Sequence, residues 1–338
     1  MKSTPESSLS GDLAQRKGAH IELASHAQTS SLEADHRFNY EPLFFTHPKT
    51  TASWPIKFLK HELSYPVWIS SMTGGTSHAR TINENLARLC GEHKLGMGLG
   101  SCRSLLEGNE RFEDFNVRRF IGDQPLFANL GLAQLEQILD AGKTHLIHEM
   151  IKKIEATGLI IHLNPLQEWF QPEGDRYQKS PLHILQNFLP MANYPVIVKE
   201  VGQGMGPKSL EALLQLPIAA IEFGAFGGTN FSLLENLRKD GGDLKRPFIK
   251  VGHTASEMVE FINGLSVQDK EFIISGGIRN VLDGYELITR CKGHSVMGLA
   301  NAFLAPALES YESVSNYFNS FRESLLTAKG ILNIRGKK

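Results

Sequence analysis

The chain has few cysteines, almost no net charge and no long apolar run, and each shortage excludes a class of protein. Its three cysteines, Cys90, Cys102 and Cys291, are far apart and form no CxxC pair, which argues against a disulfide framework or a structural zinc site. The 35 basic and 36 acidic side chains nearly cancel, whereas a protein that binds the nucleic-acid backbone normally carries a basic excess. No stretch approaches the roughly 18 apolar residues of a membrane span, and the polar residues 1–18 do not resemble a signal peptide.

The remaining composition is that of a large globular domain. Hydrophobic residues make up 41% of the 338 residues and charged residues 21%, so the chain can bury a sizeable core. Reduced thiols fit a cytoplasmic protein, and we expect neither nucleic acid nor membrane as a partner. Residues 1–36 are rich in serine, glycine, alanine and charge, and we expect them to form a flexible, mostly irregular arm. The domain proper is expected over residues 37–338.

Eight short, almost continuously apolar runs follow one another along that domain. Such runs are typical of parallel strands buried on both faces, and each is followed by a loop and a segment with helical periodicity, such as Ala79–His93. Eight such units predict an α/β fold, a closed (β/α)₈ or TIM barrel rather than an open sheet. A ninth run, 248–251, is assigned to the connection before the helix expected at 255–263. The eight runs are 67–72, 96–100, 126–130, 159–163, 196–201, 220–223, 272–275 and 296–299.

Small and polar residues stand where almost every run ends, which is the end of a barrel where active sites lie. Gly276-Gly277 follows the seventh run, and Gly298 with Ala300 follows the eighth. In barrels this pair of loops commonly binds phosphate through backbone N–H groups, because glycine lets the backbone approach closely. The adjoining Gly227-Gly228 favours phosphate binding over plain turn chemistry, and Arg279 would add a charge-assisted contact.

Two further strand ends suit a flavin. Lys199 ends the fifth run, and its side chain would enter the barrel mouth, where a cation near N1 and O2 stabilises a reduced flavin ring. A lysine that reaches the rim for solvent is the alternative. The stretch Ser71-Met72-Thr73-Gly74-Gly75 ends the first run and suits a backbone lying along a flat ring edge, with Thr73 near flavin N5. A tight turn is the alternative there.

The densest polar cluster follows the fourth run, in the stretch His-Leu-Asn-Pro-Leu-Gln-Glu. His162 and Asn164 alternate onto one face of the strand end, and Gln167 and Glu168 fall on the loop above the barrel. A single histidine is more often a core residue and a single glutamate is usually solvated, but four hydrogen-bonding groups so close together indicate a site. Glu168 is a candidate Mg²⁺ ligand, because that ion favours one or two carboxylates plus substrate phosphate oxygens.

A basic set lies in the N-terminal arm, where a short helical pattern begins. Arg16 and His20 are four residues apart and share a face of a helical turn, with Lys17 beside them. Three such groups suit a diphosphate, although the spacing alone favours a solvated basic turn.

Taken in this order, the motifs resemble the type 2, FMN-dependent isopentenyl diphosphate isomerases. The similarity extends from Arg16 to about Pro306, and its most specific part is HLNPLQE followed by QPEGDR. The resemblance implies a (β/α)₈ barrel that binds FMN, Mg²⁺ and NADPH as reductant, in a homo-tetramer or homo-octamer. It implies that FMN is held by Ser71, Met72, Thr73, Ser101, Asn129, Lys199, Thr229, Gly277, Ile278, Arg279, Ala300 and Asn301. It implies that the substrate is held by Arg16, Lys17, His20, Arg103, His162, Asn164 and Gln167, and Mg²⁺ by Glu168.

The implied reaction interconverts isopentenyl diphosphate and dimethylallyl diphosphate by a 1,3-proton shift, a step of isoprenoid biosynthesis. Reduced flavin would supply the acid and base at N5, Gln167 would relay or position a proton, and His162 would orient the substrate head. These two are the expected catalytic residues. The chain departs from the family pattern at Glu222, where aspartate is usual, at Gly252-His253-Thr254, where Gly-Ile-Pro-Thr is usual, and at 297–301.

Two other interpretations remain open at this point. An FMN barrel that oxidises 2-hydroxy acids would need a basic histidine beside the substrate carbon and an arginine for the carboxylate. Here the polar cluster is centred on glutamine and glutamate instead. A non-catalytic protein that binds flavin or an isoprenoid phosphate would show no turnover, and the intact Gln167, Glu168 and Lys199 argue against it.

Overall fold

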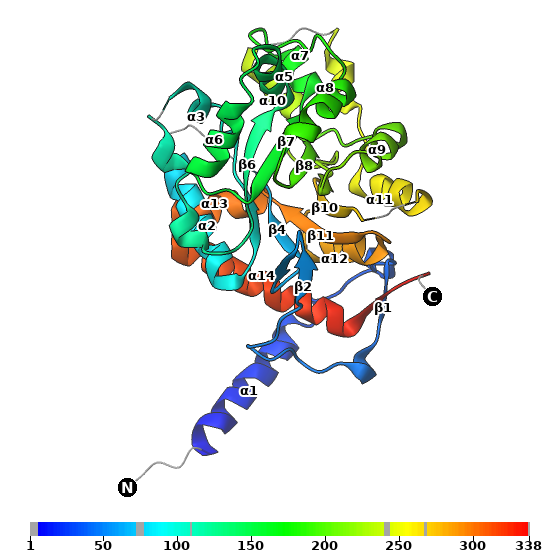
Figure 1. The fold of residues 1–338 in the computed structure, drawn as a ribbon. Coiled ribbons are helices and arrows are strands. Elements are labelled where there is room, and N and C mark those ends of the chain that lie inside the picture. The colour runs from blue at the N-terminus through cyan, green and yellow to red at the C-terminus, as the bar shows by residue number, and fades with distance from the viewer. Residues whose placement is uncertain (1–5, 72–77, 109, 240–243, 267–268, 337–338) are drawn as a thin grey trace.

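A closed barrel of eight parallel strands stands at the centre of the computed structural model (Figure 1), which describes residues 6–71, 78–108, 110–239, 244–266 and 269–336, with the backbone alone at 6–14 and 239. Its sheet order is β10-β11-β4-β5-β6-β7-β8-β9, and β9 closes onto β10 with Ala220 opposite Glu271. All eight apolar runs form strands, as predicted. The strands are β4 (Val67–Ile69), β5 (Gly96–Gly98), β6 (Leu126–Gly131), β7 (Gly158–Leu163), β8 (Val196–Glu200), β9 (Ala220–Glu222), β10 (Glu271–Ser275) and β11 (His294–Leu299).

Helices cover the outside of the barrel, because their apolar faces pack on the outward side chains of the strands. The run 248–251 is no strand: it overlaps a 3₁₀ helix, Arg246–Lys250, in the connection to which the sequence assigned it. The α-helices after β4 are α2 (Ala79–His93), α3 (Ser104–Glu107), α4 (Arg118–Ile121), α5 (Leu132–Asp140), α6 (His145–Lys153), α7 (Pro165–Phe170), α8 (Pro181–Phe188), α9 (Pro207–Leu214), α10 (Phe231–Lys239), α11 (Ala255–Gly264), α12 (Val281–Arg290), α13 (Asn301–Glu309) and α14 (Tyr311–Ile331).

The lower half of the barrel is filled with apolar side chains. One buried cluster inside it contains Trp68, Phe127, Ile160, Ile197, Ala220, Ile273 and Val296, one from almost every strand. Phe58, Leu59 and Leu63 join this cluster from the hairpin of β2 (Ile56–Phe58) and β3 (His61–Leu63), which lies across the N-terminal ends of the strands. The N-terminal end of the barrel is therefore closed by the hairpin.

The N-terminal arm contains a longer helix than the short helical pattern indicated. Helix α1 (Glu6–Leu23) has 18 residues and projects away from the barrel (Figure 1). Its Ile21 and Leu23 are 80% and 60% exposed, so this helix has apolar surface that the barrel of the same chain does not cover. Further on, β1 (Phe38–Tyr40) pairs antiparallel with β12 (Leu332–Ile334) and joins the two ends of the chain. Within the described residues, no helix combines the length and hydropathy needed to cross a bilayer.

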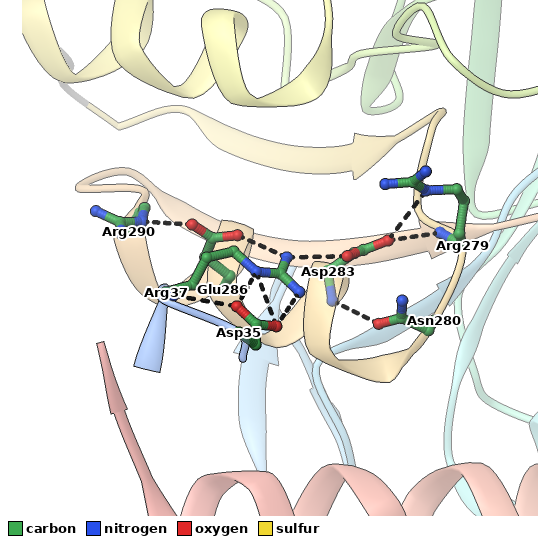
Figure 2. A network of polar contacts seen from close by, with 7 residues as sticks. All are labelled: Asp35, Arg37, Arg279, Asn280, Asp283, Glu286 and Arg290. Carbon is green, nitrogen blue, oxygen red and sulfur yellow. Dashed lines mark hydrogen bonds and ion pairs between the residues drawn. The ribbon is translucent and has the colours of Figure 1, made fainter. Parts of the chain in front are cut away.

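A network of charged side chains links the segment before β1 to the loop after β10 (Figure 2). The guanidinium of Arg37 donates to Asp35, to Asp283 Oδ1 at 2.9 Å and to Glu286 Oε2 at 2.9 Å. These carboxylates raise the pKa of Arg37 above its ordinary value. Asp283 and Glu286 belong to α12, whose first turn is capped by the side chain of Asn280. The arm is thereby fixed to the helix that follows the glycine pair of β10.

Candidate active site at the C-terminal end of the barrel

A polar layer lies directly above the apolar filling of the barrel. Successive side chains of a strand point to opposite faces, so the residue two positions after each inward apolar residue also points inward. Five of those positions are buried polar residues, from 0% exposed at Glu222 to 9% at Lys199. The layer consists of Ser70, Asn129, His162, Lys199, Glu222 and Ser275. The structure therefore brings together the predicted residues Asn129, His162 and Lys199.

The hydrogen bond between Asn129 and His162 fixes the tautomer of the histidine. The Nδ2 amino group of Asn129 donates to Leu99 O at 3.0 Å, so the other amide atom is the oxygen, which can only accept. His162 Nδ1 lies 2.7 Å from that oxygen and must carry the proton, which leaves a lone pair on Nε2. Burial and the neighbouring charge of Lys199 lower the pKa of His162 to about 4. The imidazole is thus neutral near pH 7.

Lys199 and Glu222 place opposite charges inside the barrel. The Lys199 ammonium donates to Glu200 O at 2.9 Å and lies 3.8 Å from Glu222 Oε1. Neither carboxylate oxygen of Glu222 has a hydrogen-bond partner among the described residues, although the side chain is fully buried. A buried carboxylate without donors is costly unless a charge or a ligand compensates it. Within the described part of the chain, Lys199 is the one cation that pairs with Glu222.

Glu200, at the end of β8, holds the loop that follows. Its Oε2 accepts the backbone N–H groups of Gly202, Gln203 and Gly204 at 2.6, 2.6 and 3.0 Å. Burial nevertheless raises the pKa of Glu200 to about 7. No role was predicted for Glu200, and the structure shows that it shapes the rim beside Lys199.

The cluster predicted after β7 forms a compact hydrogen-bonded group on α7. Pro165 occupies the first turn of this helix, where a missing N–H has no cost. Asn164 Nδ2 donates to Gln167 Oε1 at 3.1 Å and to Glu168 Oε1 at 2.9 Å. Glu168 Oε2 accepts the backbone N–H of Asp175 at 2.8 Å. Each oxygen of Glu168 therefore keeps lone-pair capacity for a further ligand.

Glu235, from α10, completes that cluster and was missed in the sequence. Its Oε1 accepts from Gln171 at 2.7 Å and lies 3.5 Å from Gln167 Nε2. Arg238 pairs with the other oxygen. Glu235 is 5% exposed and lies 68 residues beyond Gln167, so only the packing of α10 on α7 reveals the contact.

The glycine loops after β9 and β10 lie against each other. A Cβ atom at Gly228 would come within 3.1 Å of Gly277 N, and one at Gly276 would clash with Ala225 O at 2.1 Å. Gly276 and Gly277 also have positive φ angles of 87° and 72°, which favour glycine. No side chain covers the backbone at these glycines, and a phosphate that binds to backbone N–H groups needs such close access.

The remaining predicted residues are placed less centrally. Ser101, Thr229, Arg279 and Asn301 are exposed and Ala300 and Ile278 are partly buried, all at or after C-terminal strand ends. Arg103 approaches the α7 cluster, with Nη1 3.6 Å from Asp175 Oδ2. Met72 and Thr73 lie outside the described residues. The chain does not bring Arg16, Lys17 and His20 to the barrel mouth, because α1 projects from the other side (Figure 1).

The residues present fit a flavin phosphate and a divalent cation. The hydroxyls of Ser70 and Ser71, at the C-terminal end of β4, are buried without partners among the described residues. No group of three or more histidine, cysteine or acidic side chains in the described residues could hold a metal by itself. A cation bound at Glu168 would therefore take most of its ligands from water and substrate, as Mg²⁺ commonly does.

The closed barrel, with buried charged side chains at the C-terminal ends of its strands, defines the class of the protein: a (β/α)₈ barrel of the kind that enzymes commonly use. Relatives in sequence give the particular family. Isopentenyl-diphosphate delta-isomerase of Rickettsia africae is 33% identical over 320 residues, covering 92% of this chain and 91% of its own. The chain belongs to the isopentenyl-diphosphate delta-isomerases, as the resemblance indicated.

Other relatives agree. The isopentenyl-diphosphate delta-isomerase of Hydrogenovibrio crunogenus is 33% identical, covering 82% of this chain and 80% of its own, and that of Mycolicibacterium vanbaalenii is 34% identical, covering 80% and 77%. No family model matches the chain. Among solved structures, a lactate oxidase of Pediococcus acidilactici has a TM-score of 0.56 at 13% identity, covering 87% of this chain and 79% of its own. A mandelate oxidase carrying an FMN adduct has a TM-score of 0.53 at 12% identity, covering 86% and 87%. At such low identity these two similarities support the barrel fold alone.

Proposed function

We propose that this chain interconverts isopentenyl diphosphate and dimethylallyl diphosphate as a type 2, FMN-dependent isomerase. The observation that carries the proposal is that two polar groups lie at the same end of the barrel. His162, of the polar layer with Asn129 and Lys199, stands near the end of β7, and Asn164, of the α7 cluster with Gln167 and Glu168, follows two residues later. The first group suits a flavin, and the second suits the charged head and the proton transfers of the substrate.

The glycine loops after β9 and β10 would hold the FMN phosphate, with Arg279 and Thr229 at the rim. Lys199 would face the pyrimidine side of the ring, and Ser71, Ser101, Asn129, Ala300 and Asn301 would line the remaining contacts together with Met72 and Thr73. When bound and reduced by NADPH, the flavin would supply acid and base strength that ordinary side chains lack toward an unactivated alkene.

The α7 cluster would position the substrate and handle a proton. Gln167 sits between Asn164 and the Glu235 carboxylate, so a proton that arrives at its amide has a buried acceptor within 3.5 Å. Glu168 would bind Mg²⁺, which neutralises the diphosphate and keeps it from leaving. His162 would orient the substrate head, since an anion brought near Nε2 raises the pKa of the imidazole and turns it into a donor.

The basic set on α1 would bind the diphosphate only if α1 moves or reaches a neighbouring subunit. The exposed Ile21 and Leu23 support an assembly in which this helix packs on another chain. We therefore include a homo-tetramer or homo-octamer in the proposal, and Arg16, Lys17 and His20 as ligands of the substrate head. A cytoplasmic setting agrees with three buried cysteines that form no disulfide with one another.

The decisive experiment is solvent-deuterium incorporation followed by NMR. Purified protein is mixed with isopentenyl diphosphate, Mg²⁺ and FMN without oxygen, before and after NADPH is added. We expect deuterated dimethylallyl diphosphate only after reduction. No incorporation with FMN bound and reduced would refute the isomerase, and reduction of FMN by a 2-hydroxy acid would favour the oxidase chemistry.

A further inference from the structure

A second cavity lies at the N-terminal end of the barrel, opposite the candidate active site. Its volume is about 1140 Å³, which exceeds the roughly 300–1000 Å³ of typical ligand pockets. It is lined by the segments that lead into β8, β9, β10 and β11 and by the β2–β3 hairpin. Because the apolar filling and the hairpin separate the two ends of the barrel, this cavity and the polar layer cannot share a ligand.

Four lysines line this cavity: Lys57, Lys60, Lys270 and Lys292. None of them forms an ion pair with a carboxylate within the described part of the chain. Lys270 Nζ donates to Ile218 O at 3.1 Å and Lys292 Nζ to Asn263 O at 3.2 Å, so each keeps further N–H donors. Burial lowers the pKa of Lys270, and a bound anion would offset that effect.

The acidic side chains of the cavity do not cancel this charge. Glu271 is occupied: its Oε2 accepts the Leu59 N–H at 2.6 Å and its Oε1 lies 2.9 Å from His294 Nδ1. Asp269 is the other carboxylate in the lining. Four cations therefore face one free carboxylate and one that is tied to the hairpin, which gives the cavity a positive balance.

The opposite wall of the cavity is apolar. Pro195 and Pro217 are exposed and Tyr194 and Leu265 are partly exposed, so these side chains form the apolar surface that water reaches. The neighbouring Val196, Ile218 and Ile262 are buried. A purely inorganic anion would leave this wall in contact with water. A hydrocarbon chain would cover it and gain roughly 25 cal/mol per Å² of apolar area removed from water.

We propose that this cavity is a second binding site, for an amphiphilic phosphorylated molecule whose phosphate head meets the lysines and whose hydrocarbon chain lies on the apolar wall of Pro195, Pro217 and Leu265. Prenyl diphosphates longer than the five-carbon product have this chemistry, and they arise from condensation reactions that consume that product. Only this choice of probe rests on the proposed function.

The test is calorimetric titration of the FMN-loaded full chain with farnesyl diphosphate, in saturating isopentenyl diphosphate so that the barrel mouth is filled. We expect one equivalent to bind under these conditions. The double variant Lys60→Glu, Lys292→Glu should weaken binding at least about tenfold, since two favourable charges become repulsive. Lys152→Glu, on the exposed side of α6 and outside the cavity, makes the same kind of charge change and should leave binding unaltered.

Several outcomes would overturn the proposal. Loss of binding in saturating isopentenyl diphosphate would place the probe in the active site, and equal binding by the double variant would remove the lysines from the site. If inorganic pyrophosphate bound as tightly as farnesyl diphosphate, the apolar wall would have no part in recognition. If farnesol bound as tightly, the lysine charges would have none. If the protein has no isomerase activity but still binds farnesyl diphosphate, the missing activity refutes the proposed function and the binding supports the second site independently.

Discussion

Asp283 holds Arg279 at two points: its Oδ2 accepts the backbone N–H of Arg279 at 3.1 Å and lies 3.6 Å from the Nε of the same residue. The other oxygen, Oδ1, accepts from Arg37, so the segment before β1 and the loop after β10 share one carboxylate (Figure 2). The backbone of the glycine loop is thus fixed by a residue that we do not expect to touch any ligand.

Replacing that carboxylate should weaken flavin binding. We expect Asp283→Ala to raise the FMN dissociation constant about tenfold, a loss of about 1.4 kcal/mol, because the loop loses its charge-assisted anchor. Fluorescence titration of FMN measures this. Glu286→Gln is the matched control, since Glu286 also binds Arg37 but does not touch Arg279. Equal effects of the two changes would contradict the specific role of Asp283.

Removing the amide of Gln167 should slow the proposed proton transfer. We expect Gln167→Ala to lower kcat by about 10²-fold or more with little change in thermal stability, because the side chain is only partly buried and lies outside the apolar core. Gln171→Ala is the control: it removes the other amide on Glu235 without opening the contact to Asn164, and should slow turnover far less. An unchanged rate in Gln167→Ala would exclude the residue from the reaction.

His162 should make the protein less stable in acid. Its pKa is lowered to about 4, so the unfolded chain takes up a proton as the pH falls through 6.5, while the folded chain does not. Stability is therefore full above pH 6.5 and declines toward pH 4, by on the order of 3 kcal/mol.

Glu200 acts in the opposite direction, because a carboxyl group with a pKa raised to about 7 stabilises the fold as the pH falls. The measurement is therefore the difference between the wild-type chain and His162→Gln in chemical denaturation at several pH values. We expect the variant to lack the decline between pH 6.5 and 4. Parallel curves would show that His162 titrates normally.

Glu168→Gln should raise the Mg²⁺ concentration needed for half-maximal activity, by about tenfold, because a neutral amide binds the hard cation poorly. The amide oxygen can still accept the Asp175 N–H, while the amide NH2 group faces Asn164 Nδ2 and loses that one hydrogen bond. Glu173→Gln, an exposed carboxylate of the same turn, serves as control. If both variants respond to Mg²⁺ like the wild type, the metal is bound elsewhere.

The sequence predicted the barrel because each strand is almost uniformly apolar, and it located Asn129, His162 and Lys199 because they end such strands. It could not connect Gln167 with Glu235, since that contact depends on how two helices pack across 68 residues. Glu222 stood out only as a departure from the family pattern, yet its place two residues after Ala220 already put it on the inner face. Helix α1 was underestimated because its residues have no regular apolar face that would indicate its length.

Because the hairpin closes the N-terminal end of the barrel, the interior can be reached only from the C-terminal end of the strands. Phe58 and Leu63 are fully or almost fully buried under Trp68 and its neighbours, so nothing passes through the floor. Reactant and product of the proposed reaction, which have the same charged head, must then enter and leave by the same route. The product must leave the site before the next substrate molecule binds. Each of the two diphosphates should therefore inhibit binding of the other competitively.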